Sequence, residues 1–209
     1  MKSLLLGIVL IIILGIGGLV YRNAVEHPSQ PIACPTTAFV CPDGTSVSHI
    51  GNSCDFPTCP PPNVSLSDVG ISFALPDGFT AASSPDPTTV ATYQSATSSE
   101  KANTLTIQRF AIAASSTALA TIQQTAISGT SGAPVNPTSF SSTVIGNHRF
   151  TVVLIERFEG VIDTAYYLAR NSDVLRFDAI DQGVDWTNPN LTISTLPAHA
   201  ALVKLLSTL

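Results

Sequence analysis

The residues best suited to chemistry in this sequence are four cysteines, Cys34, Cys41, Cys54 and Cys59. An even number of cysteines in a short, proline-rich stretch is typical of disulfides formed in an oxidising compartment. Zinc sites instead favour cysteine pairs separated by about two to four residues, and only Cys54 and Cys59 come close to that spacing. We therefore predict structural disulfides and no metal site.

Histidine and serine side chains could form a hydrolytic triad, but the sequence marks no nucleophile. The four histidines, His27, His49, His148 and His199, share no motif, and no Gly-x-Ser-x-Gly elbow occurs. P-loop, dinucleotide-binding glycine and His-Glu-x-x-His patterns are also missing. We predict surface histidines, no catalytic residue, no cofactor and no enzymatic activity. A hydrolase stays as an alternative, because triads assemble from residues far apart in sequence.

The acidic residues Asp178, Asp181 and Asp185 gather near Gly183. Their carboxylates could hold Ca²⁺, but the alternating Asp-x-Asp-x-Asp-Gly spacing of a calcium loop is missing. We predict a solvated turn at the end of a strand. The neighbouring Trp186, the single tryptophan, is expected to serve packing.

An apolar N-terminal segment indicates where these groups lie in the cell. Residues 3–20 carry no charge, and as a helix they would span about 27 Å, close to the hydrocarbon thickness of a bilayer. The run is longer than that of a cleavable signal peptide and is not followed by a small-x-small site. We predict an uncleaved transmembrane signal anchor at residues 1–23.

Orientation and partners follow from charge and cysteine chemistry together. Lys2 and Arg22 nearly balance across the anchor, so the positive-inside rule does not decide its direction. Because disulfides need an oxidising compartment, we expect a single-pass cell-membrane protein with a cytoplasmic N-terminus and an extracytoplasmic C-terminal domain. A net charge of −5 and the lack of a basic run exclude nucleic acid as a partner. The expected partners are the membrane, through residues 3–20, and an unknown protein or envelope component.

Composition divides the exported part into four segments. We predict a polar stalk at residues 24–33, a disulfide-stapled Cys module at 34–60, a proline-rich linker at 61–63 and a globular domain at 64–209. Consecutive prolines favour an extended polyproline II spacer, which separates neighbouring units.

The Cys module resembles two kinds of known module. Its Cys41-Pro42-Asp43-Gly44-Thr45 run and its ending at residues 51–60, Gly-Asn-Ser-Cys-Asp-Phe-Pro-Thr-Cys-Pro, resemble short extracytoplasmic modules of bacterial proteins. The same run is partly similar to Kazal protease inhibitors, although those carry more cysteines and a glycine where Pro42 stands. The Kazal likeness implies the pairs Cys34–Cys54 and Cys41–Cys59. It also implies protease inhibition as an alternative function.

The globular domain mixes strand and helix patterns. Alternating apolar residues predict strands at 70–75, 89–94 and 103–110, with an exposed loop in the remainder of 81–101. Short turns predict an antiparallel meander, with strands at 143–145, 149–158, 161–170 and 174–180. Ser115 and Ser116 could cap a helix of about a dozen residues, and a final helix at 196–209 should pack on the sheet. The predicted fold class is α+β, an antiparallel β-sheet flanked by helices, preceded by a transmembrane helix and a small disulfide module.

The domain also resembles, in element order, the fold shared by PsbP photosystem subunits and the Ran-binding Mog family. The likeness rests on the opening segment 71–79, Ile-Ser-Phe-Ala-Leu-Pro-Asp-Gly-Phe, on Tyr166-Tyr167-Leu168 and on the closing segment 205–209. It implies a binding or scaffolding role and transfers no catalytic residue. The sequence therefore predicts a membrane-anchored extracytoplasmic binding or scaffold protein of unknown ligand.

Overall fold

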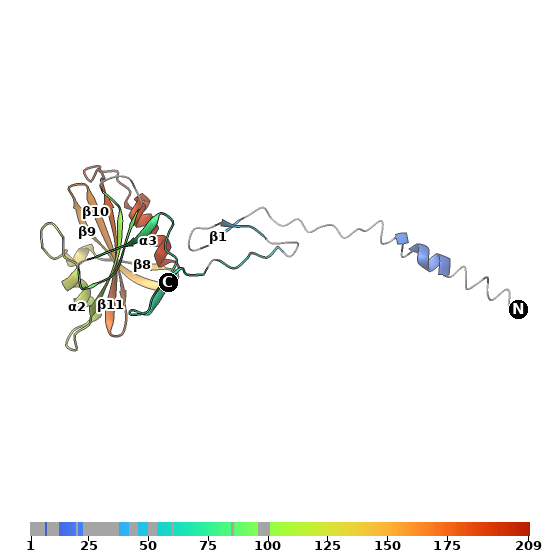
Figure 1. Cartoon of the computed structure of the whole chain (residues 1–209), viewed down its shortest axis with the longest axis horizontal. Coiled ribbons are helices and arrows are strands. Elements are labelled where there is room, and N and C mark those ends of the chain that lie inside the picture. The colour runs from blue at the N-terminus through green and yellow to red at the C-terminus, as the bar shows by residue number, and fades with distance from the viewer. Residues whose placement is uncertain are drawn as a thin grey trace. The chain divides into compact units, whose positions relative to one another are not determined.

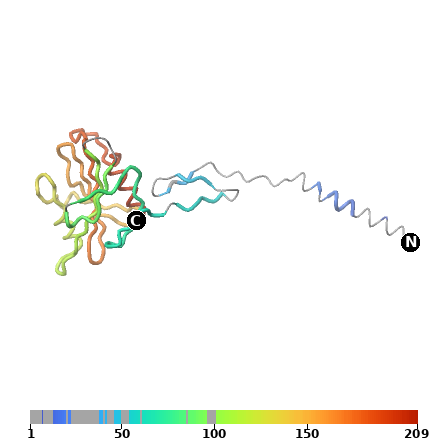
Figure 2. Tube along the Cα trace, in the orientation of Figure 1, coloured from blue at the N-terminus to red at the C-terminus, as the bar shows by residue number. Residues whose placement is uncertain are grey.

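The computed structural model describes residues 7, 13–19, 21–22, 38–41, 46–49, 54–59, 61–84, 86–95 and 101–209. Figure 1 labels the helices and strands for which there is room, and Figure 2 follows the chain on a scale that runs from blue to red toward the C-terminus. The chain divides into two compact units, residues 1–39 with 47–58 and residues 40–46 with 59–209. Each unit is described by itself below.

In the first unit, helical structure is described at residue 7, residues 13–19 and residues 21–22. No helix among the described residues is long and apolar enough to cross a membrane. The predicted anchor at 3–20 is described only in part, and the predicted stalk at 24–33 falls outside the described residues. Three rings of this unit stack on one another: Phe56 lies 5.5 Å from Phe39 and 4.0 Å from His49, between ring centroids.

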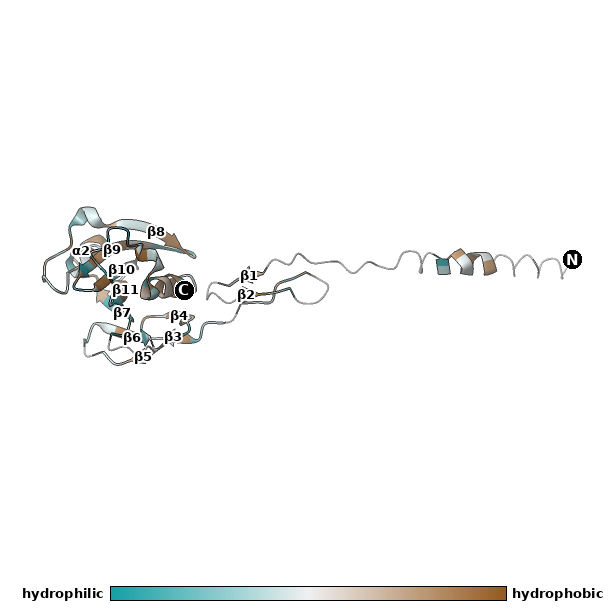
Figure 3. Ribbon diagram, turned by 90° about the horizontal axis from the view of Figure 1, so that it is seen from above, coloured by the Kyte–Doolittle hydropathy of each residue, from teal (hydrophilic) through white to brown (hydrophobic). Residues whose placement is uncertain are grey.

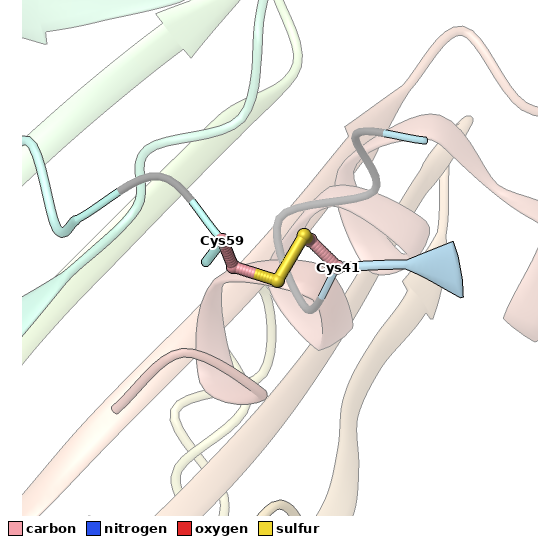
Figure 4. Close-up of a disulfide and its surroundings, with 2 residues drawn as sticks. All are labelled: Cys41 and Cys59. Carbon is pink, nitrogen blue, oxygen red and sulfur yellow. A yellow bond between two sulfur atoms is a disulfide. The ribbon is translucent and has the colours of Figure 1, made fainter. Parts of the chain in front are cut away.

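The cysteine prediction is confirmed for one pair. A short two-stranded sheet joins β1 (Phe39–Val40) and β2 (Ser46–Val47). Figure 4 shows the disulfide between Cys41 and Cys59. Cys54 is also disulfide-bonded. Cys34 lies outside the described residues, so the predicted pair Cys34–Cys54 stays a prediction.

The large domain is built on a seven-stranded antiparallel sheet in the order β5-β6-β7-β11-β10-β9-β8. Its strands are β5 (Phe79–Ala82), β6 (Thr89–Ser95), β7 (Thr104–Ala111), β8 (Ser141–Ile145), β9 (His148–Phe158), β10 (Val161–Ala169) and β11 (Asp173–Gln182). A separate hairpin pairs β3 (Val64–Leu66) with β4 (Ile71–Phe73). The predicted α+β class and the predicted meander are confirmed. Strands β3 and β5 were not predicted.

Helix α3 (Pro197–Leu206) covers one face of the sheet, mainly over β11 and β7. Pro197 stands in its first turn, as predicted, and Figure 3 colours the helix largely brown, as expected for an element that packs on a core. The core on this side, which we call the α3 face, includes Phe73, Phe150 and Phe177 from the strands and Leu202 from the helix, all fully buried.

Helix α2 (Ala118–Thr125) lies over β10 and β11 and, with them, encloses a second hydrophobic cluster, on what we call the α2 face. Its N-cap is Thr117, whose hydroxyl accepts a hydrogen bond from the Ala120 N–H, so the predicted Ser115–Ser116 cap is wrong by one residue. The helix is shorter than predicted, because Ile127 forms a β-bridge with Pro134 directly after it. Two 3₁₀ turns, η1 (Pro137–Ser139) and η2 (Ile193–Thr195), complete the domain.

Candidate functional site

Strand alternation places three ionisable side chains inside the α2 face. Arg176 and Asp178 are two residues apart on β11, so they point the same way, and Asp163 joins them from β10. An Arg176 nitrogen lies 2.7 Å from an Asp178 oxygen and 3.8 Å from an Asp163 oxygen. The Thr106 hydroxyl on β7 donates to the second Asp178 oxygen at 3.0 Å. We call Asp163, Arg176 and Asp178 the buried charge cluster.

The cluster holds two carboxyl groups for one guanidinium, so its protonation is uneven. The Asp178 side chain is 3% exposed, and burial raises its pKa, although Arg176 and Thr106 oppose that rise. Asp163 is 15% exposed and has weaker contacts. Burial, followed by the charge of Asp178, holds the pKa of Asp163 well above its ordinary value. Asp163 is therefore the carboxyl group of the cluster that binds a proton more readily, whereas Asp178 forms the close ion pair with Arg176.

Arg176 also connects this cluster to helix α2. Its Nη1 donates to the Thr125 carbonyl at 2.7 Å, at the end of the helix where unpaired carbonyls favour a cation. Its guanidinium lies 5.7 Å from the centroid of the Tyr167 ring. Burial raises the pKa of Tyr167 to about 12, so this ring stays neutral. A change in the charge of the cluster would therefore alter the hydrogen bond between Arg176 and the C-terminal turn of α2.

A cavity of about 510 Å³ opens on the other side of that turn, between α2 and β7. That volume is within the usual range of about 300–1,000 Å³ for small-molecule sites. Its walls come from β7, the segment that follows it, helix α2 and the loop before β6, through Thr88, Arg109, Phe110, Ala111, Ala113, Ser115, Ser116, Thr121, Gln124 and Thr125. We call it the α2–β7 cavity.

Most polar groups of this cavity belong to hydroxyl and amide side chains. The Thr121 hydroxyl donates to the Thr117 carbonyl, and the Thr125 hydroxyl donates to the Thr121 carbonyl. Each hydroxyl oxygen keeps lone pairs that can accept a further hydrogen bond. Ser115 and Gln124 are exposed, so their side chains can donate as well as accept.

The predicted site residues do not converge here. Asp178 and Asp181 are three positions apart on one strand and lie on opposite faces of the sheet, while Asp185 is exposed in the turn beyond. The prediction of a solvated acidic turn is therefore wrong for Asp178 and Asp181, both of which are buried. No cluster of possible metal ligands occurs among the described residues.

Asp181 serves helix α3 instead. Its two carboxylate oxygens accept hydrogen bonds from the Ala198 and His199 N–H groups, at 2.6 Å and 3.1 Å. These are unpaired donors of the first helical turn, which carries no capping side chain of its own. Trp186 packs against Phe158, with 5.4 Å between ring centroids, as the sequence predicted.

The prediction of surface histidines is wrong for His199, which is 8% exposed. Its Nε2 lies 3.0 Å from the Tyr166 hydroxyl on the α3 face, and burial lowers its pKa. His49 and His148 are half-buried, and His27 lies outside the described residues. The described contacts of His199 include no serine, so they do not form the triad of the hydrolase alternative.

Comparisons with protein-family models, with curated proteins and with solved structures find no match to this chain.

Proposed function

We propose that this chain is a membrane-anchored extracytoplasmic binding protein and that the α2–β7 cavity is its ligand site. The observation that carries the proposal is the cavity itself, an open space of about 510 Å³ with hydrogen-bonding walls beside a firmly fixed helix end. Pockets of this size with a few placed polar groups are the usual form of a small-molecule site.

The residues around the cavity favour binding over catalysis. Among the described residues of its lining there is no carboxylate, histidine or cysteine side chain, so Ser115 and Ser116 have no general base beside them in that lining. The nearby buried charge cluster makes its close contacts within the domain, with Thr106 and the Thr125 carbonyl. A role in fixing the helix end accounts for these contacts. The PsbP- and Mog-like element order is in keeping with a binding role, which the proposal adopts.

The membrane placement in this proposal rests on the apolar run at residues 3–20 and on cysteine chemistry. The Cys41–Cys59 disulfide supports an oxidising compartment. A C-terminal fusion to alkaline phosphatase, which folds only outside the cytoplasm, tests the placement. We expect phosphatase activity in the membrane fraction. A fusion that is fully expressed but inactive would mean that the C-terminal domain lies in the cytoplasm, which contradicts the proposed orientation.

The ligand site is tested by a fragment screen on the full chain in a zwitterionic, sugar-free detergent. Amide chemical shifts are recorded while neutral, anionic and cationic fragments are added in turn. We expect at least one fragment to shift the signals of Thr121 and Gln124, and the substitution Gln124→Ala to weaken that response. Gln123→Ala is the matched control, because Gln123 is the next residue of the same helix and does not line the cavity. If no fragment moves the cavity signals, the binding site is not there.

A further inference from the structure

We propose that two copies of this chain pair through strand β8, antiparallel and edge to edge, so that their sheets join into one. Strand β8 is the last strand on one side of the seven-stranded sheet, and its partner within the sheet is β9. Figure 3 shows β8 along the outer edge of the large domain. An edge strand presents a row of unpaired main-chain groups, which is a template for pairing with another strand.

The hairpin between β8 and β9 shows which main-chain groups of β8 are free. Gly146 and Asn147 form a two-residue turn, because Ile145 lies opposite His148. The residues that flank such a turn exchange hydrogen bonds, and hydrogen-bonded positions then alternate along the strand. Residues 141, 143 and 145 therefore bond to β9, whereas the N–H and C=O groups of residues 142 and 144 point outward. The contacts of the described residues give these outward groups no partner.

Strand β8 also lacks the features that usually protect a sheet edge. Natural edge strands are short, or carry charged side chains, prolines or bulges. Strand β8 reads Ser-Ser-Thr-Val-Ile, and its register with β9 contains no bulge. The other edge strand, β5, has four residues and stands between a Pro-Asp-Gly turn and a Pro-Asp-Pro segment. We therefore assign the pairing to β8 and not to β5.

The register makes β8 complementary to a second copy of itself. With Thr143 on the twofold axis, Ser142 of each copy lies opposite Val144 of the other, so the outward groups of both strands meet and form hydrogen bonds. Thr143 then faces Thr143 of the second copy at a non-hydrogen-bonded position, where a pair of threonines is favourable. Val144 is 58% exposed, and the added sheet covers part of this apolar side chain.

The charges of the chain favour a second copy over a charged partner strand. Strand β8 has no ionisable side chain, so it offers a charged strand no opposite charge. On β9 the nearest permanent charge is Arg149, which lies opposite Val144. In the paired sheets the two Arg149 residues are separated by three strand spacings, about 14 Å, which exceeds the Debye length of about 8 Å at physiological salt. The two copies therefore meet at β8 without bringing like charges together.

The paired surface is small, because β8 has five residues. Stable interfaces bury about 1,200–2,000 Å² in total, more than one pair of short strands supplies, so we expect a reversible dimer. Two copies anchored in one membrane, as proposed above, would meet at a raised local concentration.

Cysteine cross-linking of the full chain in a zwitterionic detergent tests the pairing. Thr143→Cys puts an added thiol on the twofold axis, where the Cβ atoms of the two copies lie about 4.5 Å apart, close enough for a disulfide. Thr80→Cys, at an exposed position of β5, is the matched control for the other sheet edge. Under mild oxidation we expect Thr143→Cys to form covalent dimers at least about tenfold faster than Thr80→Cys. Wild-type protein shows what the native cysteines contribute, and contacts between other parts of two chains are present in both variants.

Two further changes in the Thr143→Cys background should prevent the pairing and keep the β8–β9 hairpin. Val144→Pro deletes an outward N–H that β9 does not use, which an edge strand tolerates. Val144→Lys adds a charge to each of the two paired strands. Each change acts twice in a symmetric dimer, so each should slow cross-linking about tenfold or more. Thr80→Lys in the same background is the control and should change the rate by less than about twofold.

Slow hydrogen exchange of the Phe150 and Val152 amides, which face β8, shows whether a variant keeps the hairpin. If Thr143→Cys cross-links no faster than Thr80→Cys, β8 does not pair with a second copy and the proposal is overturned. The free edge is then open to an extended peptide of another protein. Cross-linking that is unchanged in the folded Val144 variants also overturns the proposal. None of these results bears on the proposed ligand site, because β8 does not line the α2–β7 cavity.

Discussion

At the scale of single residues, only Asp178 of the buried charge cluster was singled out in the sequence analysis, and its burial was not predicted. Alternation along β10 places Asp163, Ala165 and Tyr167 on one face and Tyr166 on the other. Alternation along a strand does not show whether another element packs on either face of that strand. Burial of Asp163 depends on where its strand stands in the sheet and on helix α2, which comes from an earlier part of the chain. The strand order and the position of α2 depend on contacts between residues far apart in the sequence, so local residue spacing does not predict them.

The raised pKa of Asp163 predicts a dependence of stability on pH. Because folding raises the pKa of this carboxyl, the folded domain holds the proton more tightly than the unfolded chain does. That stabilisation is fully present below the unfolded pKa of about 3.9 and is lost as pH rises through the folded pKa. In Asp163→Asn the side chain stays neutral, so the loss at high pH should disappear.

Urea unfolding of both proteins between about pH 4 and pH 9 measures this effect. We expect the variant to lose less stability than the wild type as the pH rises over that range, because its amide has no proton to lose. The pKa of His199 is lowered by burial, so its stabilisation is lost as pH falls, but both proteins share that term. Asp185→Asn, at an exposed position, is the control and should follow the wild-type profile. Parallel profiles for Asp163→Asn and the wild type would mean that Asp163 is ionised in the folded domain.

At the scale of elements, the sequence predicted best where turns and strands are adjacent along the chain. The turns at Gly146 and Gly160 need backbone angles with positive φ, which glycine adopts without strain, and both joined the strands of the predicted meander. Strand β5 escaped prediction because it is short, lies at the sheet edge and reads Phe-Thr-Ala-Ala, which carries little β signal. The walls of the α2–β7 cavity were missed for a related reason, since segments before and after β7 meet there only after the sheet has formed.

The start of helix α3 illustrates an element that depends on a distant residue. Asp181 on β11 supplies the acceptors that a capping side chain next to the helix would normally provide, and it lies buried on the α3 face. We expect Asp181→Ala to lower the free energy of unfolding by about 1–3 kcal/mol, because two buried N–H groups lose their partner. Asp181→Asn keeps one carbonyl acceptor and should lose less.

Chemical denaturation monitored at the fluorescence of the native tryptophan measures both variants, with Asp185→Ala as the control for removal of a nearby carboxylate. An Asp181→Ala variant as stable as the control would show that water replaces the cap at no cost.

At the scale of the whole molecule, the two hydrophobic clusters of the large domain show where cooperative stability resides. Both contain only residues from Val64 onward. The Cys41–Cys59 disulfide comes before this point, separated from it by the proline-rich linker predicted at residues 61–63. The bond constrains a short loop that builds little apolar core of its own, whereas the sheet domain is held by burial on both of its faces.

Cys41→Ser should therefore act locally. A disulfide with a sequence separation of 18 stabilises its own loop by about 3 kcal/mol, mainly by limiting the unfolded chain. Without it, amide hydrogen exchange should speed up between residues 46 and 59. The main calorimetric transition should keep its midpoint within about 2 °C, because neither hydrophobic cluster loses a contact. Wild-type protein treated with a reductant is the matched comparison and should show the same pattern. A fall of the midpoint of the main transition by more than about 5 °C would mean that the cooperatively folding unit includes the disulfide and therefore extends to residues before Val64.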